Sequence, residues 1–119
     1  MVGNPEFGRR IRARREEKRL KDPTFSLRQF AKAVGISPTF LSKVETGEFA
    51  PPAPDKIKKM AELLNEDSDE LLALAGRVDP DLTDIIREKP KAMADLLRRA
   101  QSMSKGQIDK LGRQAEKKS

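Results

Sequence analysis

The chain has 119 residues, carries 25 Lys and Arg against 19 Asp and Glu, and contains neither Cys nor His. This length suits one hydrophobic core and leaves little room for a separate catalytic domain. Without Cys or His there is no thiolate nucleophile, imidazole base, disulfide or Cys/His zinc site, so we predict a protein that is not an enzyme and uses no cofactor and no metal.

The start of the chain and its charge pattern bear on the location of the protein and on the kind of partner it binds. No apolar run that could serve as a signal peptide or membrane span follows Met1, which predicts a cytoplasmic protein that does not bind a membrane. Residues 1–64 carry 14 basic and 8 acidic side chains, whereas residues 65–119 carry 11 of each. A basic first half suits a polyanion, but solvated helix faces have the same composition, so charge leaves both interpretations open.

Apolar residues recur at helical spacing in five segments between residues 4 and 76. Ser26 and Ser37 are suitable N-caps for the second and third segments, and Gly35 suits a left-handed helix end between them. The expected helices cover residues 7–20, 26–35, 37–47, 57–64 and 68–76. The turn-like residues 21–25 can be a surface loop or an additional backbone contact to a ligand, and we favour the loop.

Beyond Gly76 the pattern changes to shorter helical pieces, with a break at residues 102–106 and a polar ending at residues 113–119 that predicts a frayed basic tail. No segment has the alternation of a strand. The predicted fold is therefore all-α. It comprises a five-helix domain at residues 1–76 and a short helical extension at residues 77–119.

The second and third helices carry the most specific signal. Ala31 is small where two helices would touch, Gly35 provides the turn, and Leu41 and Val44 are apolar core positions of the next helix. The intervals of four, six and three residues are typical of a helix-turn-helix. A helical hairpin in an ordinary bundle is the alternative that this motif alone leaves open.

Further runs at residues 7–12, 26–31 and 35–47 match a known family. Together with the motif, they resemble the λ-repressor-like, Xre-type helix-turn-helix regulators, and the SinR-type subgroup in particular. The resemblance implies a transcriptional regulator, acting as a repressor or autoregulator, whose third helix enters the major groove of double-stranded DNA while the second helix and the following loop contact phosphates.

Transferred position by position, the resemblance implies a set of DNA contacts. They are Arg28, Ser37, Thr39, Phe40, Ser42, Lys43 and Thr46. Arg28 would contact a phosphate, and Phe40 would be partly exposed at the interface. Two departures from the family pattern predict fewer contacts to the DNA backbone. Leu27 stands where many members have Gln, and residues 48–52 lack the basic side chains common in that loop.

The family pattern also pairs an Arg of the first helix with the Glu that follows the recognition helix. Here these residues are Arg15 and Glu45, which we expect to form a buried structural ion pair. Glu45 is therefore excluded from the predicted DNA contacts.

The extension carries apolar residues that the five-helix domain does not need: Leu82, Ile85, Ile86, Met93, Leu96 and Leu97. They can fold back on the domain or form a dimer seam, and we favour a homodimer because regulators of this type usually bind paired half-sites. Either arrangement would bury them. The alternative function is an antitoxin of the same fold, in which residues 85–119 bind a protein partner.

Overall fold

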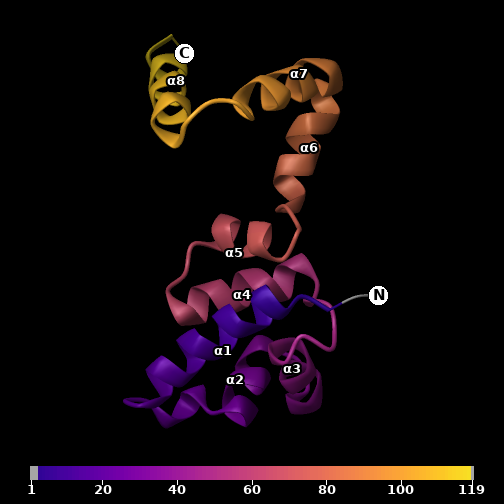
Figure 1. The fold of residues 1–119 in the computed structure, drawn as a ribbon, viewed down its shortest axis with the longest axis vertical. Coiled ribbons are helices and arrows are strands. Elements are labelled where there is room, and N and C mark those ends of the chain that lie inside the picture. Colours follow the sequence, from indigo (N-terminus) through magenta and orange to yellow (C-terminus); the bar gives the residue numbers. More distant parts are fainter. Residues whose placement is uncertain (1–2, 119) are drawn as a thin grey trace. The chain divides into compact units, whose positions relative to one another are not determined.

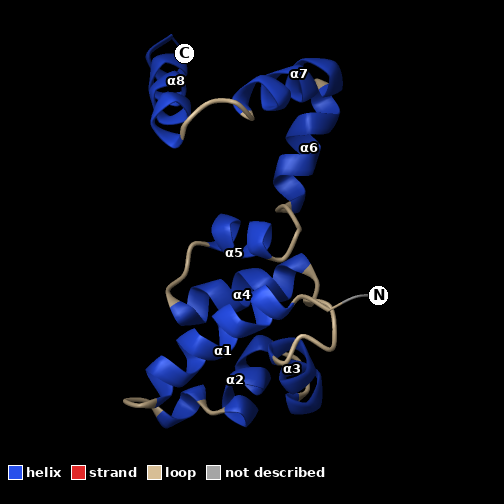
Figure 2. Cartoon of the chain, in the orientation of Figure 1, coloured by secondary structure: helices blue, strands red, loops and turns tan. Residues whose placement is uncertain are grey.

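The computed structural model describes residues 3–118, so the outermost positions of the two predicted domains, Met1, Val2 and Ser119, lie outside it. Its described residues form helices and loops without a strand (Figure 2), which confirms the all-α prediction. The chain divides into two units, residues 1–80 and 81–119. The first unit contains α1 (Pro5–Arg19), a short 3-10 helix η1 (Pro23–Phe25), α2 (Leu27–Val34), α3 (Pro38–Glu45), α4 (Pro54–Leu64) and α5 (Ser68–Leu74).

The caps of α2 and α3 set their lengths. The Ser26 and Ser37 hydroxyls accept hydrogen bonds from the backbone N–H groups of Gln29 and Phe40, at 3.2 and 3.0 Å. Gly35 ends α2 with φ 91°, a left-handed conformation that costs glycine little. The two helices are therefore short and joined by a tight turn, as the motif predicted.

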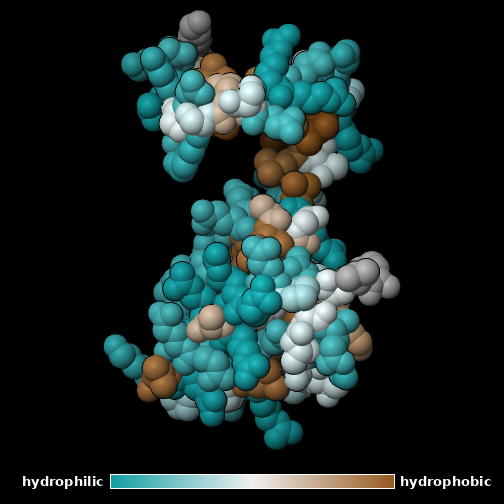
Figure 3. Space-filling model, in the orientation of Figure 1, coloured by the Kyte–Doolittle hydropathy of each residue, from teal (hydrophilic) through white to brown (hydrophobic). Residues whose placement is uncertain are grey.

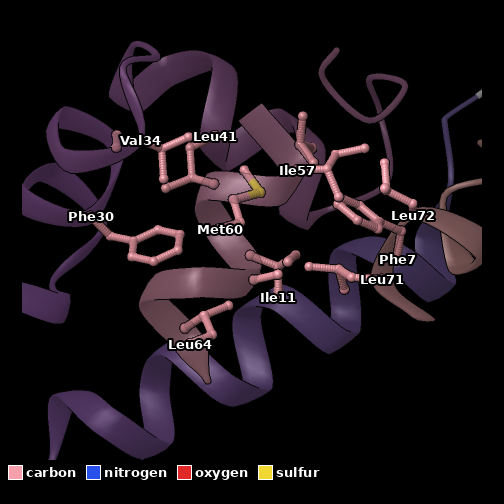
Figure 4. Packing of buried hydrophobic residues seen from close by; sticks show 13 residues of the cluster. Phe7, Ile11, Phe30, Val34, Leu41, Ile57, Met60, Leu64, Leu71 and Leu72 are labelled. Atoms are coloured by element: carbon pink, nitrogen blue, oxygen red, sulfur yellow. The ribbon is translucent and has the colours of Figure 1, made fainter. Parts of the chain in front are cut away.

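Thirteen buried apolar side chains from all five α-helices of the first unit form one core (Figure 4). Phe7 and Ile11 of α1, Leu41 of α3 and Ile57 and Met60 of α4 are completely shielded from water. Figure 1 places α2 and α3 together at one end of this unit and α5 at the other. The core therefore packs against the inner faces of both α2 and α3.

The crossing of α1 and α3 depends on Gly8. A Cβ atom there would collide with the backbone carbonyl oxygens of Val44 and Glu45. Because glycine has no side chain, the backbones of α1 and α3 can approach closely, which fixes the position of α3 against the core.

Residues 21–25 are more than a surface loop. They include η1, and the half-buried Phe25 ring packs against the core, with its centroid 6.0 Å from that of Phe30. Asp22 caps η1 through its carboxylate, which accepts from the Thr24 hydroxyl and backbone N–H. These two hydrogen bonds lower the pKa of Asp22. The sequence did not reveal this packing because a five-residue segment has no measurable helical period.

The first unit ends four residues later than the predicted boundary at Gly76. The Arg77 guanidinium donates to the Pro51 carbonyl oxygen at 2.8 Å, and the Lys58 ammonium lies 2.8 Å from the Asp79 carboxylate. These contacts hold residues 77–79 to the helix-turn-helix unit.

α6 (Pro80–Glu88) begins at the last residue of the first unit, and the second unit contains the rest of α6 together with α7 (Pro90–Ala100) and α8 (Lys105–Lys118). The prediction of a frayed tail at residues 113–119 is wrong for its described residues, because α8 continues to Lys118. Ser104 and Gln107 form a capping box: the Ser104 hydroxyl accepts from the Gln107 backbone N–H at 3.1 Å, and the Gln107 side chain accepts from the Ser104 N–H at 2.9 Å. This cap starts a helix where the sequence was interpreted as a break.

Candidate nucleic-acid interface

Four predicted DNA contacts share one side of α3 and its C-cap. Thr39, Ser42, Lys43 and Thr46 are spaced by three, one and three residues, which places them on one helical face. Thr39, Ser42 and Thr46 are exposed and Lys43 is half-buried, whereas Leu41 and Val44 point into the core. α3 therefore presents hydroxyls and one ammonium outward from a fixed apolar base.

Phe40 and Ser37 have structural roles in this region. Phe40 is half-buried against the core, and its ring centroid lies 6.0 Å from that of the exposed Phe49. Ser37 caps α3, so its hydroxyl already accepts from Phe40. Both side chains remain at the surface, which leaves their predicted DNA contacts possible in space but untested.

Arg28 lies on the first turn of α2 and is exposed. Leu27, beside it, is half-buried and packs against the core. The position where many family members carry Gln thus contributes to packing here, and Arg28 is the basic side chain at this end of α2. Its phosphate contact stays a prediction.

Lys43 is surrounded by residues of the loop that follows α3. Its ammonium lies 3.4 Å from the Glu48 carboxylate and 5.9 Å from the centroid of the Phe49 ring. The other Glu48 carboxylate oxygen accepts from the Thr46 hydroxyl at 3.1 Å. Glu48 therefore contacts two of the predicted DNA-reading side chains.

Arg15 and Glu45 form the expected buried pair, with only 3% and 6% of each residue exposed. Arg15 Nε and Nη2 donate to the two Glu45 carboxylate oxygens at 2.8 and 2.9 Å, and Nη1 donates to the Phe25 carbonyl oxygen at 3.1 Å. The hydrogen bond to Glu45 raises the pKa of Arg15 despite burial, which opposes the charged form. This pair joins α1 to the end of α3 and thereby orients α3.

The apolar residues predicted to form a seam lie on α6 and α7, and none of them is buried in this structure. Leu82, Ile85, Leu96 and Leu97 are 39% to 52% exposed, while Ile86 and Met93 are half-buried. The space-filling view shows apolar surface over α6 and the start of α7 (Figure 3). The single chain therefore does not bury these residues, and their burial in a homodimer stays a prediction.

Residues 3–118 lack two further kinds of feature. No group of three or more Asp, Glu, Cys or His side chains is arranged to hold a metal ion. In the same part of the chain, no helix is both long and apolar enough to cross a membrane.

Comparison with known proteins agrees with this geometry. A family model described as a helix-turn-helix domain matches residues 6–75, more than half of the chain. The chain therefore belongs to this helix-turn-helix family, which confirms the resemblance that the motif indicated.

The curated relatives are transcriptional regulators of Bacillus subtilis (strain 168). The HTH-type transcriptional repressor RghR is 36% identical over 73 residues, which cover 61% of this chain and 50% of RghR. RghRB, an uncharacterized HTH-type transcriptional regulator, is 35% identical over 72 residues, which cover 60% of this chain and 48% of RghRB. The chain thus spans about half the length of the curated relatives it matches.

A solved SinR protein/SinI protein complex contains a chain that is similar to this one, with a TM-score of 0.48 and 25% identity. The match covers 94% of this chain and 97% of that chain.

Sequence reasoning missed Glu48 and Phe49 as members of this surface. It noted only that residues 48–52 lack basic side chains. The turn at Gly47 brings Glu48 and Phe49 back onto α3, where their backbone N–H groups donate to the Lys43 carbonyl oxygen at 2.9 and 3.1 Å. A Glu-x-Gly-Glu-Phe run after a recognition helix is the signal that could have located them.

Proposed function

We propose that this chain is a sequence-specific, double-stranded DNA-binding transcriptional regulator that acts as a repressor, with α3 inserted in the major groove. The outward row of Thr39, Ser42, Lys43 and Thr46 on a helix anchored by the Arg15–Glu45 pair carries the proposal. Hydroxyls and an ammonium can hydrogen-bond to base edges and phosphates. The packing of α3 on the apolar core fixes the positions of these groups. The name of the relative RghR supports repression as the direction of regulation.

The first test is the dependence of binding on salt. A duplex selected from a random pool should bind with an affinity that falls steeply as the salt concentration rises, because basic side chains displace counterions from phosphates. Fluorescence anisotropy at several salt concentrations measures this slope. Binding that is independent of salt, or absence of binding to every duplex, would contradict the proposal.

The second test separates base reading from phosphate contact. Lys43→Ala should reduce discrimination between the selected duplex and random DNA by about 1–3 kcal/mol, and Ser42→Ala should reduce it less. Arg28→Ala should weaken binding to both duplexes alike, because a phosphate contact carries no sequence information. If Arg28→Ala alone removes discrimination, α3 is not the reading helix.

We also propose that residues 81–118 hold two copies together on DNA. The exposed and half-buried apolar residues of α6 and α7 include pairs spaced by three and four residues, so each helix presents one apolar face. A symmetric pair of chains would cover these faces and would place two recognition helices on successive turns of one DNA face.

A further inference from the structure

The carboxylate of Glu48 occupies the DNA-reading face of α3. One of its oxygens lies 3.4 Å from the Lys43 ammonium, and the other accepts from the Thr46 hydroxyl at 3.1 Å. No element of the first unit other than α3 and its own loop is involved in these two contacts. An acidic side chain thus sits where the proposed function requires contact with a polyanion.

The backbone holds Glu48 in this place. Its N–H group donates to the Lys43 carbonyl oxygen at 2.9 Å, and the neighbouring Phe49 N–H donates to the same oxygen at 3.1 Å. The Phe49 ring centroid lies 5.9 Å from the Lys43 ammonium, and the Phe40 ring lies next to Phe49. The folded turn therefore holds the Glu48 backbone beside Lys43, so that the carboxylate is within reach of the Lys43 ammonium.

The charges have a direct consequence for DNA binding. The Lys43 side chain is 40% exposed and that of Glu48 is 58% exposed, so both face solvent and the pair is weak enough to open. A phosphate or guanine that approaches Lys43 must replace the carboxylate, and the carboxylate repels the phosphates at close range.

We infer that Glu48 is an affinity-limiting residue that competes with DNA for Lys43 and Thr46. This inference rests on the proposed function. Glu48 lowers affinity for every duplex, because it neutralises the one cation of the α3 reading row until DNA displaces it. Its effect is greatest at low salt, where the contacts between charges are least screened.

The test compares Glu48→Gln with the wild-type chain on the selected duplex and on random DNA. Glutamine keeps the size of the side chain and can still accept from Thr46, but it removes the charge. We expect Glu48→Gln to tighten binding to both duplexes about fivefold at about 50 mM salt, and less at about 200 mM. Because the side chain is exposed, the variant should keep the stability of the wild type.

Two controls separate local competition from a general charge effect. Glu70→Gln makes the same charge change at an exposed position of α5, a helix that lies at the opposite end of the unit from α3 (Figure 1). We expect it to tighten binding much less. In a Lys43→Ala background, most of the gain from Glu48→Gln should disappear, since the two residues act through their mutual contact.

The possible outcomes are distinct. Weaker binding by Glu48→Gln would overturn the inference and show that the carboxylate itself contacts DNA, for example as an acceptor for a cytosine amino group. Equal gains from Glu48→Gln and Glu70→Gln would also overturn it. If the wild-type chain and all variants bind no duplex, the proposed function fails and the inference fails with it.

Discussion

The Arg15–Glu45 pair shows how one contact positions the candidate interface. All three guanidinium nitrogens donate hydrogen bonds, and each Glu45 oxygen accepts one from Arg15. The pKa of Arg15 is raised, so the guanidinium stays charged at every pH below the ordinary arginine range. The charged guanidinium therefore contributes its full stabilisation at every pH below the pKa of Arg15 in the unfolded chain. This contribution is lost as the pH rises through the raised pKa of Arg15 in the folded chain.

Replacing one partner should be costly. Glu45→Ala leaves the buried guanidinium with two unpaired donors, and we expect a loss of about 3 kcal/mol in the free energy of unfolding, measured by urea denaturation. Glu17→Ala is the matched control, because its pair with Arg14 is exposed and should contribute at most about 1 kcal/mol. Equal effects of the two substitutions would show that the buried pair does not stabilise the fold.

Single residues differed in how far the sequence could predict them. The family motif identified Arg15 and Glu45 because both partners stand at fixed places in the pattern. Glu48 could not be found in this way, because its approach to Lys43 depends on the direction of the chain after Gly47. The residue types are visible in the sequence, but the direction of the chain after a turn depends on the folded structure.

The α1–α3 crossing is the most constrained contact between elements. Gly8→Ala should destabilise the chain by about 1–3 kcal/mol, because the added methyl group meets backbone carbonyl oxygens that cannot move without shifting a helix. Thermal unfolding followed by circular dichroism measures the loss. Gly112→Ala is the control: it makes the same change within α8, where nothing lies within 4 Å of the added Cβ, and should be neutral or slightly stabilising. A neutral Gly8→Ala would indicate that α1 and α3 are more widely separated.

Helices could be predicted from the sequence where the apolar period and the capping residues indicated the same bounds. The segments of α2 and α3 carry an apolar face, a serine N-cap and a glycine stop, and their positions follow the prediction. α8 carries only two large apolar residues, Ile108 and Leu111, and both are exposed. Its helix rests on the Ser104–Gln107 capping box and on helix-forming polar residues, which an apolar period does not detect.

At the scale of the whole molecule, the two units differ in how they bury apolar surface. Among the described residues, the thirteen side chains of the apolar core lie between Phe7 and Leu72. Between residues 81 and 118, by contrast, no apolar side chain with described burial is fully buried. The first unit therefore has its own core, whereas the second has apolar faces suited to a partner surface.

This division predicts that folding and DNA binding can be separated by truncation. A chain truncated after Pro80 should stay folded, since it keeps the core and the contacts of Arg77 and Asp79, but it should bind a palindromic duplex about 100-fold more weakly than the full chain. Two recognition helices must be spaced by roughly 34 Å to bind one DNA face, and a symmetric contact between the second units would set that spacing. Sedimentation of both chains, with and without the duplex, measures association, and circular dichroism measures whether the truncated chain is folded.

Substitutions in the full chain make the same test without truncation. Ile85→Glu on α6 and Leu97→Glu on α7 should each shift the full chain from dimer to monomer, because a carboxylate would be buried in the seam. Thr83→Glu makes a similar change at an exposed polar position of α6 and serves as the control. A full-length monomer on DNA, or a truncated chain that dimerises equally well, would assign these apolar faces to another protein partner, as an antitoxin would require.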